Sequence, residues 1–252
     1  MTRVGVSGAA GRMGRLVAEA VAAVPDLELV AGYDPYGAGQ VAGGIAVTGD
    51  PAALEAAEVV VEFTNPAVVM ENLARWAGMG RHAVVGTSGF DAARLEALRA
   101  LWRGPGNCLV VPNFSIGAVL MMRFAAQAAP HFAAAEIVEL HHDRKADAPS
   151  GTALATAAGM AAAGGRQERA VTAAETLPGA RGAAAQGVPV HAVRLPGLLA
   201  HQEGLLGSPG ETLTIRHDTT DRAAFLPGVL LAIRRVGSLS DPVTVGLEAL
   251  LG

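Results

Sequence analysis

Short apolar runs alternate with segments of helical periodicity along the first 111 residues of the chain. Runs such as Val59-Val60-Val61 carry no polar alternation, which is typical of strands covered on both faces. The runs are residues 4–6, 27–31, 59–61, 83–85 and 109–111. Apolar residues recur at helical spacing between them, over residues 12–24, 67–77 and 91–102. This alternation predicts an α/β domain built on a parallel sheet with helices on both faces.

The pattern changes after residue 115. Period-two alternation appears, as in Thr212-Leu213-Thr214-Ile215-Arg216, which is typical of an antiparallel strand with one exposed face. The strands predicted here are residues 136–142, 190–194, 199–206 and 211–217. The helices predicted here are residues 117–129, 151–163 and 225–236. Residues 164–188 are rich in glycine, alanine and proline and are expected to form a long loop.

These patterns predict two domains. Residues 1–114, joined by the returning segment 223–252, are expected to form a Rossmann-like α/β domain with a parallel sheet. Residues 115–222 are expected to form an α+β domain with a mixed open sheet.

Composition narrows the class of protein. Of the 252 residues, 51% are hydrophobic and 17% are charged, which excludes long disordered segments. The single cysteine, Cys108, excludes a disulfide framework and any cysteine-rich metal site, and it suits the reducing cytoplasm. Because Cys108 lies in an apolar run, we expect it in the core rather than as a nucleophile. The net charge of −4 argues against nucleic acid as a main partner.

Targeting and membrane signals are not expected. Met1-Thr2-Arg3 leads directly into the first predicted strand and leaves no room for a signal sequence, so the predicted location is cytoplasmic. The longest uncharged stretch, residues 104–122, is interrupted by Pro105, Asn107 and Pro112, so we expect no membrane-spanning helix.

A glycine-rich loop joins the first predicted strand to the first predicted helix. Its residues are Gly8, Ala9, Ala10, Gly11, Arg12, Met13 and Gly14, with the spacing G-x-x-G-x-x-G. Glycines there allow backbone N–H groups to approach a pyrophosphate at the helix N-terminus. Asp34 follows the second strand, where a carboxylate accepts hydrogen bonds from the adenosine ribose. The alternative is a turn that is glycine-rich only for packing, with Asp34 as a solvated acid.

The charges around this loop bear on the choice of nicotinamide cofactor. The Asp34 carboxylate repels a 2′-phosphate, and no arginine or lysine follows it directly. Arg12 is the one nearby cation in the loop that can neutralise such a phosphate. We therefore expect NADH to be preferred, or NADH and NADPH both to be accepted.

Two further loops follow predicted parallel strands, at the sheet edge where such folds bind ligands. One is Gly86-Thr87-Ser88-Gly89 and the other is Val111-Pro112-Asn113-Phe114. Their small and amide residues are suited to contact the nicotinamide ribose or carboxamide. Each loop taken alone is more often a simple turn.

The densest group of chemically active residues lies between Glu139 and Thr152. His141 and His142 are adjacent on a strand and point to opposite faces, so they are poor joint ligands and we expect no metal. One histidine can exchange protons near neutral pH, and Lys145 supplies a proton and a positive charge. Ser150, Gly151 and Thr152 open a helix, where free N–H groups and hydroxyls bind a carboxylate. The segment predicts a site for a small acid that gains a proton; the alternative is a charged surface turn before a capped helix.

The sequence lacks the residues that two other kinds of catalytic site require. Neither Tyr33 nor Tyr36 has a lysine four residues later, so a Tyr–Lys dehydrogenase pair is missing. The loop at residues 86–89 lacks the G-x-S-x-G spacing of a hydrolase nucleophile elbow.

The run H-H-x-x-K-x-D-A-P-S-G-T, from His141 to Thr152, closely resembles the signature of the 4-hydroxy-tetrahydrodipicolinate reductase family, long called dihydrodipicolinate reductase. The resemblance extends over nearly the whole chain. Its other segments are residues 8–14, 63–64, 86–89, 112–117, 193–203 and 214–218. Ser88 stands where threonine is common in the family, and a hydroxyl is kept.

The resemblance implies NAD(P)H-dependent reduction of 4-hydroxy-tetrahydrodipicolinate, via dihydrodipicolinate, to tetrahydrodipicolinate in diaminopimelate and lysine synthesis. By position it implies that His141 is a proton donor or acceptor and Lys145 a proton donor. It assigns substrate binding to His142, Ser150, Gly151 and Thr152. It assigns cofactor binding to Gly8, Ala9, Ala10, Gly11, Arg12, Met13, Asp34, Gly86, Thr87, Ser88, Val111, Pro112, Asn113 and Phe114. It also implies a homotetramer joined through the sheet of the second domain.

Two alternatives from other functional classes stay open at this point. A non-catalytic dinucleotide-binding sensor of the same fold needs the loop at residues 8–14 but not the pair His141 and Lys145, so retention of that pair argues against it. An oxidoreductase of similar fold that acts on another small acid needs both the loop at residues 8–14 and the pair His141 and Lys145.

Overall fold

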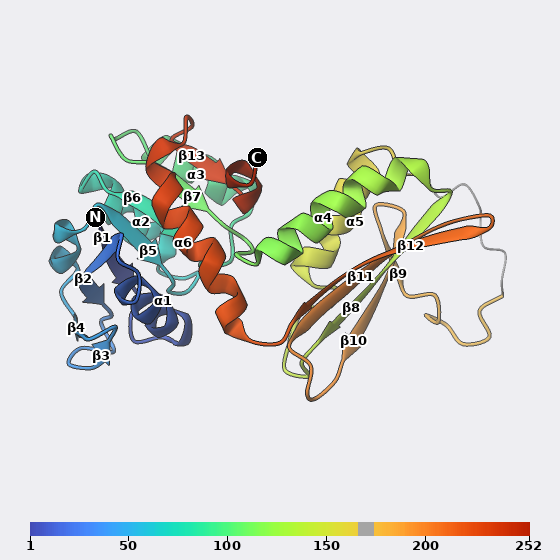
Figure 1. Ribbon diagram of the computed structural model, residues 1–252, viewed down its shortest axis with the longest axis horizontal. Helices are drawn as coiled ribbons and strands as arrows, with labels where there is room; N and C mark the ends of the chain where they lie inside the picture. The colour runs from blue at the N-terminus through green and yellow to red at the C-terminus, as the bar shows by residue number, and fades with distance from the viewer. Residues whose placement is uncertain (166–173) are drawn as a thin grey trace. The chain divides into compact units, whose positions relative to one another are not determined.

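The computed structural model describes residues 1–165 and 174–252, and the chain divides into two compact units. Unit 1 comprises residues 1–116 and 225–252, and unit 2 comprises residues 117–224 (Figure 1). Each unit has its own sheet and its own buried core.

Unit 1 is built on an eight-stranded sheet with the strand order β13-β7-β6-β5-β1-β2-β4-β3. Every neighbouring pair is parallel except the short pair of β3 and β4. The strands are β1 (Thr2–Ser7), β2 (Leu27–Tyr33), β3 (Val41–Ala42), β4 (Ile45–Thr48), β5 (Val59–Glu62), β6 (His82–Val85), β7 (Cys108–Val110) and β13 (Val243–Val245). The predicted Rossmann-like parallel sheet is confirmed.

Four helices accompany this sheet: α1 (Arg12–Ala22), α2 (Val69–Gly78), α3 (Ala92–Leu101) and α6 (Leu226–Arg235). Strands β5 and β7 are buried along their whole length, as their apolar runs predict, and the burial of β5 extends to Glu62 at its end. The chain crosses from one side of β1 to the other between β2 and β5, which places the loops after β1 and β5 at the point where the strand order reverses. Open α/β sheets bind their ligands at that point.

Three strands of unit 1 were not predicted from the sequence. β3, β4 and β13 have two, four and three residues, which is too short for a hydrophobic period to emerge. β13 adds to the edge of the sheet by pairing Val243 with Cys108. Cys108 itself is buried, as expected, and burial raises the pKa of its thiol, which keeps it protonated.

Unit 2 is built on a mixed sheet with the strand order β12-β11-β8-β10-β9. β10 runs parallel to β8, and the other pairs are antiparallel, so the predicted mixed open sheet is confirmed. The strands are β8 (Ala134–His141), β9 (Ala183–Ala185), β10 (Val188–Arg194), β11 (Ala200–Ser208) and β12 (Glu211–Thr219).

The expected loop over residues 164–188 requires a correction. Residues 166–173 lie outside the described residues, but β9 lies inside the stretch and β10 begins at Val188. The alanines of β9 carry no alternation that a sequence pattern could register, and the strand forms because β10 supplies its hydrogen-bonding partner.

Helices α4 (Ile116–Ala128) and α5 (Gly151–Ala162) lie along one face of this sheet (Figure 1). Their small side chains pack against alternate residues of β8. The core of unit 2 includes Ala125, Ala157, Met160, Ile137 and Leu206. We call the other face of the sheet the open face; it carries the intervening residues, such as Glu136 and Leu140. Over the described ranges, no helix is both long and apolar enough to cross a membrane.

Candidate functional site

The glycine-rich loop of unit 1 forms a tight turn between β1 and α1. Gly8 has φ of +81°, and a Cβ there would lie 2.3 Å from the carbonyl oxygen of Phe63. A Cβ at Gly14 would lie 2.0 Å from the carbonyl oxygen of Gly8. Two glycines of the motif are thus required by geometry. Gly11 is the N-cap, so no side chain covers the first amides of α1, which have no partner inside the helix.

Asp34 lies directly beside this loop. One carboxylate oxygen accepts a 3.3 Å hydrogen bond from the Ala10 N–H, and the other accepts a 3.0 Å bond from the Tyr36 N–H. The structure therefore brings the predicted ribose-binding acid and the predicted pyrophosphate loop together. Arg12, the cation considered for a 2′-phosphate, is exposed on the first turn of α1.

Phe63, the residue after β5, lies against all three loops that the sequence singled out. Its carbonyl oxygen lies against Gly8, and its ring lies where a Cβ of Gly86 would be, 2.1 Å from Cε1. Its ring centroid is 5.6 Å from that of Phe114. Phe63 therefore brings the three predicted cofactor loops, at positions 8–13, 86–88 and 111–114, to its own neighbourhood in unit 1.

A buried acid supports that surface. Glu62 is fully buried and accepts hydrogen bonds from Trp76 Nε1 at 2.9 Å, from Asn72 Nδ2 at 3.3 Å and from the hydroxyl of Thr64. Thr87 joins the same network, because its hydroxyl donates to the Glu62 carbonyl oxygen and accepts from the Thr64 N–H. The Thr87 hydroxyl thus ties the loops after β5 and β6 together.

In unit 2, β8 ends at His141 and a short turn follows it. The Lys145 N–H donates to the His142 carbonyl oxygen at 3.2 Å, which closes the turn. The Lys145 ammonium donates a 2.7 Å hydrogen bond to Asp147, and the Lys145 side chain is 22% exposed. Lys145 is the only lysine in the sequence, and every other long basic side chain is arginine. Lysine differs from arginine in that it can release its proton.

Helix α5 begins immediately after the turn. Ser150 is its N-cap, and the Ser150 hydroxyl oxygen accepts a 3.2 Å hydrogen bond from the Ala153 N–H. The sequence suggested that the Ser150 N–H is free. In the structure it donates a 3.0 Å hydrogen bond to Glu139. Gly151 is exposed on the first turn and Thr152 is half-buried. The helix start is therefore open at Gly151 rather than at Ser150.

Glu139 forms hydrogen bonds with His141, with the start of α5 and with Arg194 of β10. Its side chain is fully buried, and His141 Nδ1 lies 2.5 Å from its Oε2. Arg194, at the end of β10, donates to both carboxylate oxygens at 2.8 and 2.9 Å and also to the Asp147 carbonyl oxygen at 2.6 Å. Sequence reasoning assigned no role to Glu139 or Arg194. The spacing of Glu139 and His141 was the available signal, because residues two apart on a strand share a face.

These contacts shift the pKa values of His141 and Glu139. Burial lowers the pKa of His141, and its hydrogen bond to Glu139 opposes that effect in part. Burial alone would raise the pKa of Glu139, but hydrogen bonds from Arg194, His141 and Ser150 outweigh it and hold the pKa below its usual value. His142 points its Nδ1 into the protein, where no partner is found among the described residues.

Comparison with known proteins decides the family. The family model described as dihydrodipicolinate reductase, N-terminus, matches residues 2–114, and the model described as dihydrodipicolinate reductase, C-terminus, matches residues 117–251. The chain belongs to the dihydrodipicolinate reductase family. The resemblance seen in the sequence is confirmed.

Relatives within the family match over the full length. The 4-hydroxy-tetrahydrodipicolinate reductase of Thermobifida fusca is 55% identical, with 100% of both chains covered. That of Nocardia farcinica is 53% identical over 99% of this chain and 98% of its own. The solved structure of dipicolinate-bound dihydrodipicolinate reductase from Paenisporosarcina sp. TG-14 has a TM-score of 0.87 and 37% identity, with 100% of both chains covered. Dihydrodipicolinate reductases are NAD(P)H-dependent oxidoreductases of diaminopimelate and lysine synthesis.

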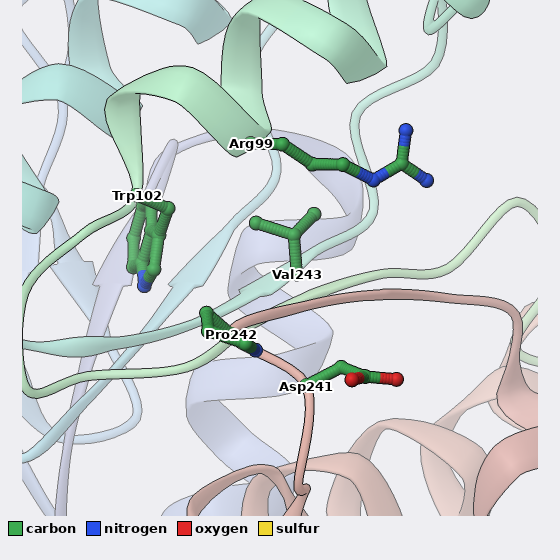
Figure 2. Close-up of a pocket in the computed structure, with 5 residues that line it drawn as sticks. All are labelled: Arg99, Trp102, Asp241, Pro242 and Val243. Carbon is green, nitrogen blue, oxygen red and sulfur yellow. The ribbon is translucent and has the colours of Figure 1, made fainter.

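A hollow of about 440 Å³ elsewhere in unit 1 does not belong to either group of family residues. Figure 2 shows Arg99, Trp102, Asp241, Pro242 and Val243 around it. Val243 pairs with Cys108 at the first residue of β7, so the hollow lies at the amino end of these strands. The dinucleotide loops lie at the carboxyl ends. Within residues 1–165 and 174–252, no group of three or more His, Cys, Asp or Glu side chains is placed to hold a metal ion.

Proposed function

We propose that this chain reduces 4-hydroxy-tetrahydrodipicolinate, via dihydrodipicolinate, to tetrahydrodipicolinate with NAD(P)H. The observation that carries the proposal is the grouping of His141, Lys145 and the start of α5 on one turn of unit 2, in a chain that matches the family from end to end. That grouping offers a proton-exchanging imidazole, an ammonium and exposed helix amides to a small dicarboxylate.

The residues of unit 1 fit a dinucleotide. The uncapped start of α1 and the close approach at Gly8 and Gly14 form the cradle that a pyrophosphate requires. We assign pyrophosphate binding to residues 8–13 and ribose binding to Asp34. We assign the nicotinamide end to residues 86–88 and 111–114, which Phe63 joins to the glycine loop. Reduced nicotinamide, when bound, supplies the hydride.

Unit 2 supplies charge and protons. The substrate is a dianion, so Lys145 and the first amides of α5 offset its charge, with His142 and the Ser150–Thr152 segment holding its carboxylates. Addition of hydride to the conjugated C=C–C=N system leaves negative charge on the ring. His141 and Lys145 stabilise that charge, and the ring takes up one proton from this pair.

The glycine loop provides a direct test of the cofactor assignment. Gly14→Ala places a Cβ against the Gly8 carbonyl oxygen, and the resulting overpacking costs about 1–3 kcal/mol and displaces the loop. We expect the Kd for NADH, measured by nicotinamide fluorescence, to rise at least about tenfold. Gly78→Ala, at the end of α2 with open space around it, is the matched control and keeps the parent Kd. Parent-like binding by Gly14→Ala contradicts the assignment.

Cofactor preference follows from Asp34. Its carboxylate lies beside the glycine loop and would repel a 2′-phosphate there, so we propose that NADH is preferred or that both cofactors are accepted. Steady-state kcat/KM for each cofactor checks this. In Asp34→Asn the ratio of kcat/KM for NADPH to that for NADH should rise, because the repulsion is removed, and in Arg12→Gln it should fall. A preference of the parent for NADPH above a hundredfold is the contradicting result.

We further propose that the protein is a homotetramer assembled through the open face of the unit 2 sheet. Val193 is 36% exposed and shares that face with Leu140, its partner across β10 and β8. An ion-pair chain crosses β11 and β12 on the same face, and it consists of Glu203, Arg216, Asp218 and His201. A face with both apolar and paired polar groups is suited to contact between copies.

The activity itself is tested by a spectrophotometric assay. Pyruvate and aspartate semialdehyde are condensed by an aldol reaction, the purified protein and NADH are added, and the absorbance of reduced nicotinamide is followed. We expect oxidation of NADH that depends on both the condensation product and the protein. A protein that binds NADH but never oxidises it in this mixture contradicts the proposal and favours a sensor of the same fold.

A further inference from the structure

Glu139 receives hydrogen bonds from three separate elements of unit 2. His141 follows it on β8, Ser150 is the N-cap of α5, and Arg194 ends β10. The four contacts measure 2.5 Å to His141 Nδ1, 3.0 Å to the Ser150 N–H, and 2.8 and 2.9 Å to the two Arg194 Nη atoms. The side chain is fully buried, so no water competes for either oxygen.

The carboxylate is ionised in this setting. Arg194 meets it in a bidentate pair, and a charged acceptor with three donor groups around it is strongly stabilised. The same donors hold the pKa of Glu139 below its usual value. An ionised carboxylate has no hydrogen to give and can only accept.

The ionised state of Glu139 determines the tautomer of His141. Because Glu139 only accepts, Nδ1 must carry the hydrogen in this 2.5 Å contact. The neutral imidazole therefore keeps Nδ1–H, and its Nε2 is left as the atom that takes or gives a proton.

We propose that Glu139 is the positioning residue of the proton-transfer site, fixing His141 in the Nδ1–H tautomer and tying it to the start of α5 through Ser150 and Arg194; this rests on the proposed role of His141. In the proton step, the proton on Nε2 of the imidazolium passes to the substrate ring, and Nδ1–H stays with the imidazole. The Glu139 charge stabilises the imidazolium before the step. Arg194 keeps Glu139 ionised, so that it does not accept the Nδ1 proton outright.

We expect Glu139→Gln to reverse the tautomer of His141, because an amide can accept at only one of its two positions. The amide oxygen must stay with the donors Ser150 N–H and Arg194 Nη2 at the Oε1 position. The amide NH₂ then takes the Oε2 position, where Arg194 Nη1 loses its acceptor and His141 Nδ1 must accept and move its hydrogen to Nε2. The charged groups facing the ring of His141 are Glu139, Lys145 and Arg194, so loss of the negative one also lowers the pKa of His141.

The same strand offers a matched control. Glu136 also pairs with a histidine and an arginine, with 2.7 Å to His191 Nε2 and an ion pair to Arg181. It lies on the open face, away from His141. Glu136→Gln removes a carboxylate with the same kind of partners and leaves the tautomer and pKa of His141 as they are in the parent.

The first test is ¹⁵N NMR of imidazole-labelled protein without ligands, with the His141 signals assigned by their loss in His141→Asn. We expect Nδ1–H in the parent and in Glu136→Gln, and Nε2–H with a lower pKa in Glu139→Gln. An Nε2–H tautomer in the parent, or an unchanged tautomer and pKa in Glu139→Gln, overturns the proposal. If Glu139→Gln does not fold, Arg194→Lys is used instead, because it keeps the Glu139 carboxylate. His141 must carry Nδ1–H in that variant, and Nε2–H there overturns the proposal.

The second test is kinetic. We expect Glu139→Gln to lower kcat between about 10- and 10⁴-fold, with KM for NADH unchanged and the pH profile of the residual kcat moved to lower pH. A purely structural role would lower kcat without moving the profile, and that result contradicts the proposal. A parent that does not oxidise NADH with the condensation product refutes the proposed function alone, because the NMR measurement still reports on Glu139.

Discussion

Lys145→Ala is expected to lower kcat by about a hundred- to a thousandfold, the cost of removing one donor that stabilises charge in a transition state. The Lys145 side chain is 22% exposed and lies on the turn that joins His141 to α5. It is therefore partly desolvated, and its charge acts strongly on a bound dianion. Because Lys145 belongs to unit 2, the Kd for NADH should stay near that of the parent. Steady-state kinetics and nicotinamide fluorescence measure the two quantities.

Two further variants separate charge from proton donation. Lys145→Arg keeps the positive charge but does not release a proton at neutral pH, so it should restore the KM for substrate and not kcat. Arg144→Ala removes the exposed cation next to Lys145 and should leave kcat within about twofold of the parent, as for an exposed charge. Turnover near the parent value in Lys145→Ala would count against the assignment.

The single lysine also permits a chemical test on the unmodified chain. An amine-acylating reagent has only the Lys145 ammonium and the N-terminal amine to modify. We expect acylation at Lys145 to abolish turnover, and dipicolinate to slow that modification. Mass spectrometry of the digested protein separates the two sites.

His141→Asn is expected to lower kcat by about 10²–10⁴-fold, the range for loss of a general acid or base. Asparagine keeps an N–H toward Glu139 but cannot titrate. In the parent, His141 must be protonated to donate, and burial lowers its pKa, so kcat should fall as pH rises through a value below that of an ordinary histidine. That limb of the pH profile should be missing in the variant.

The control for His141→Asn is His191→Asn. His191 pairs with Glu136 at 2.7 Å on the open face and should not alter the pH limb of kcat. A pH profile that is the same in His141→Asn and in the parent contradicts the role of His141, even if kcat falls.

Local patterns account for most of what was predictable. The apolar runs in β5 and β7 have no polar alternation, and burial on both faces leaves a parallel sheet as the arrangement that satisfies them. The loop at Gly8 and Gly14 was recognised because the steric requirement lies within seven residues. His141 and Lys145 were placed together for the same reason, since one turn contains both.

What the sequence did not show depends on pairing across long separations. Arg194 meets Glu139 over a separation of 55 residues, through the parallel pairing of β10 with β8, and no local pattern announces that contact. The capture of the Ser150 N–H by Glu139 is likewise a tertiary effect. β13 forms only because β7 offers it an edge.

The most direct test of the account is a crystal structure of this protein with NADH and dipicolinate bound together. We predict a carboxylate of the ligand at Lys145 Nζ and the first amides of α5, the His141 Nε2 within hydrogen-bonding distance of the ligand, and the nicotinamide ring stacked on the ligand ring. A complex in which the Lys145 and His141 side chains both point into bulk solvent, with the ligand held elsewhere, would contradict it.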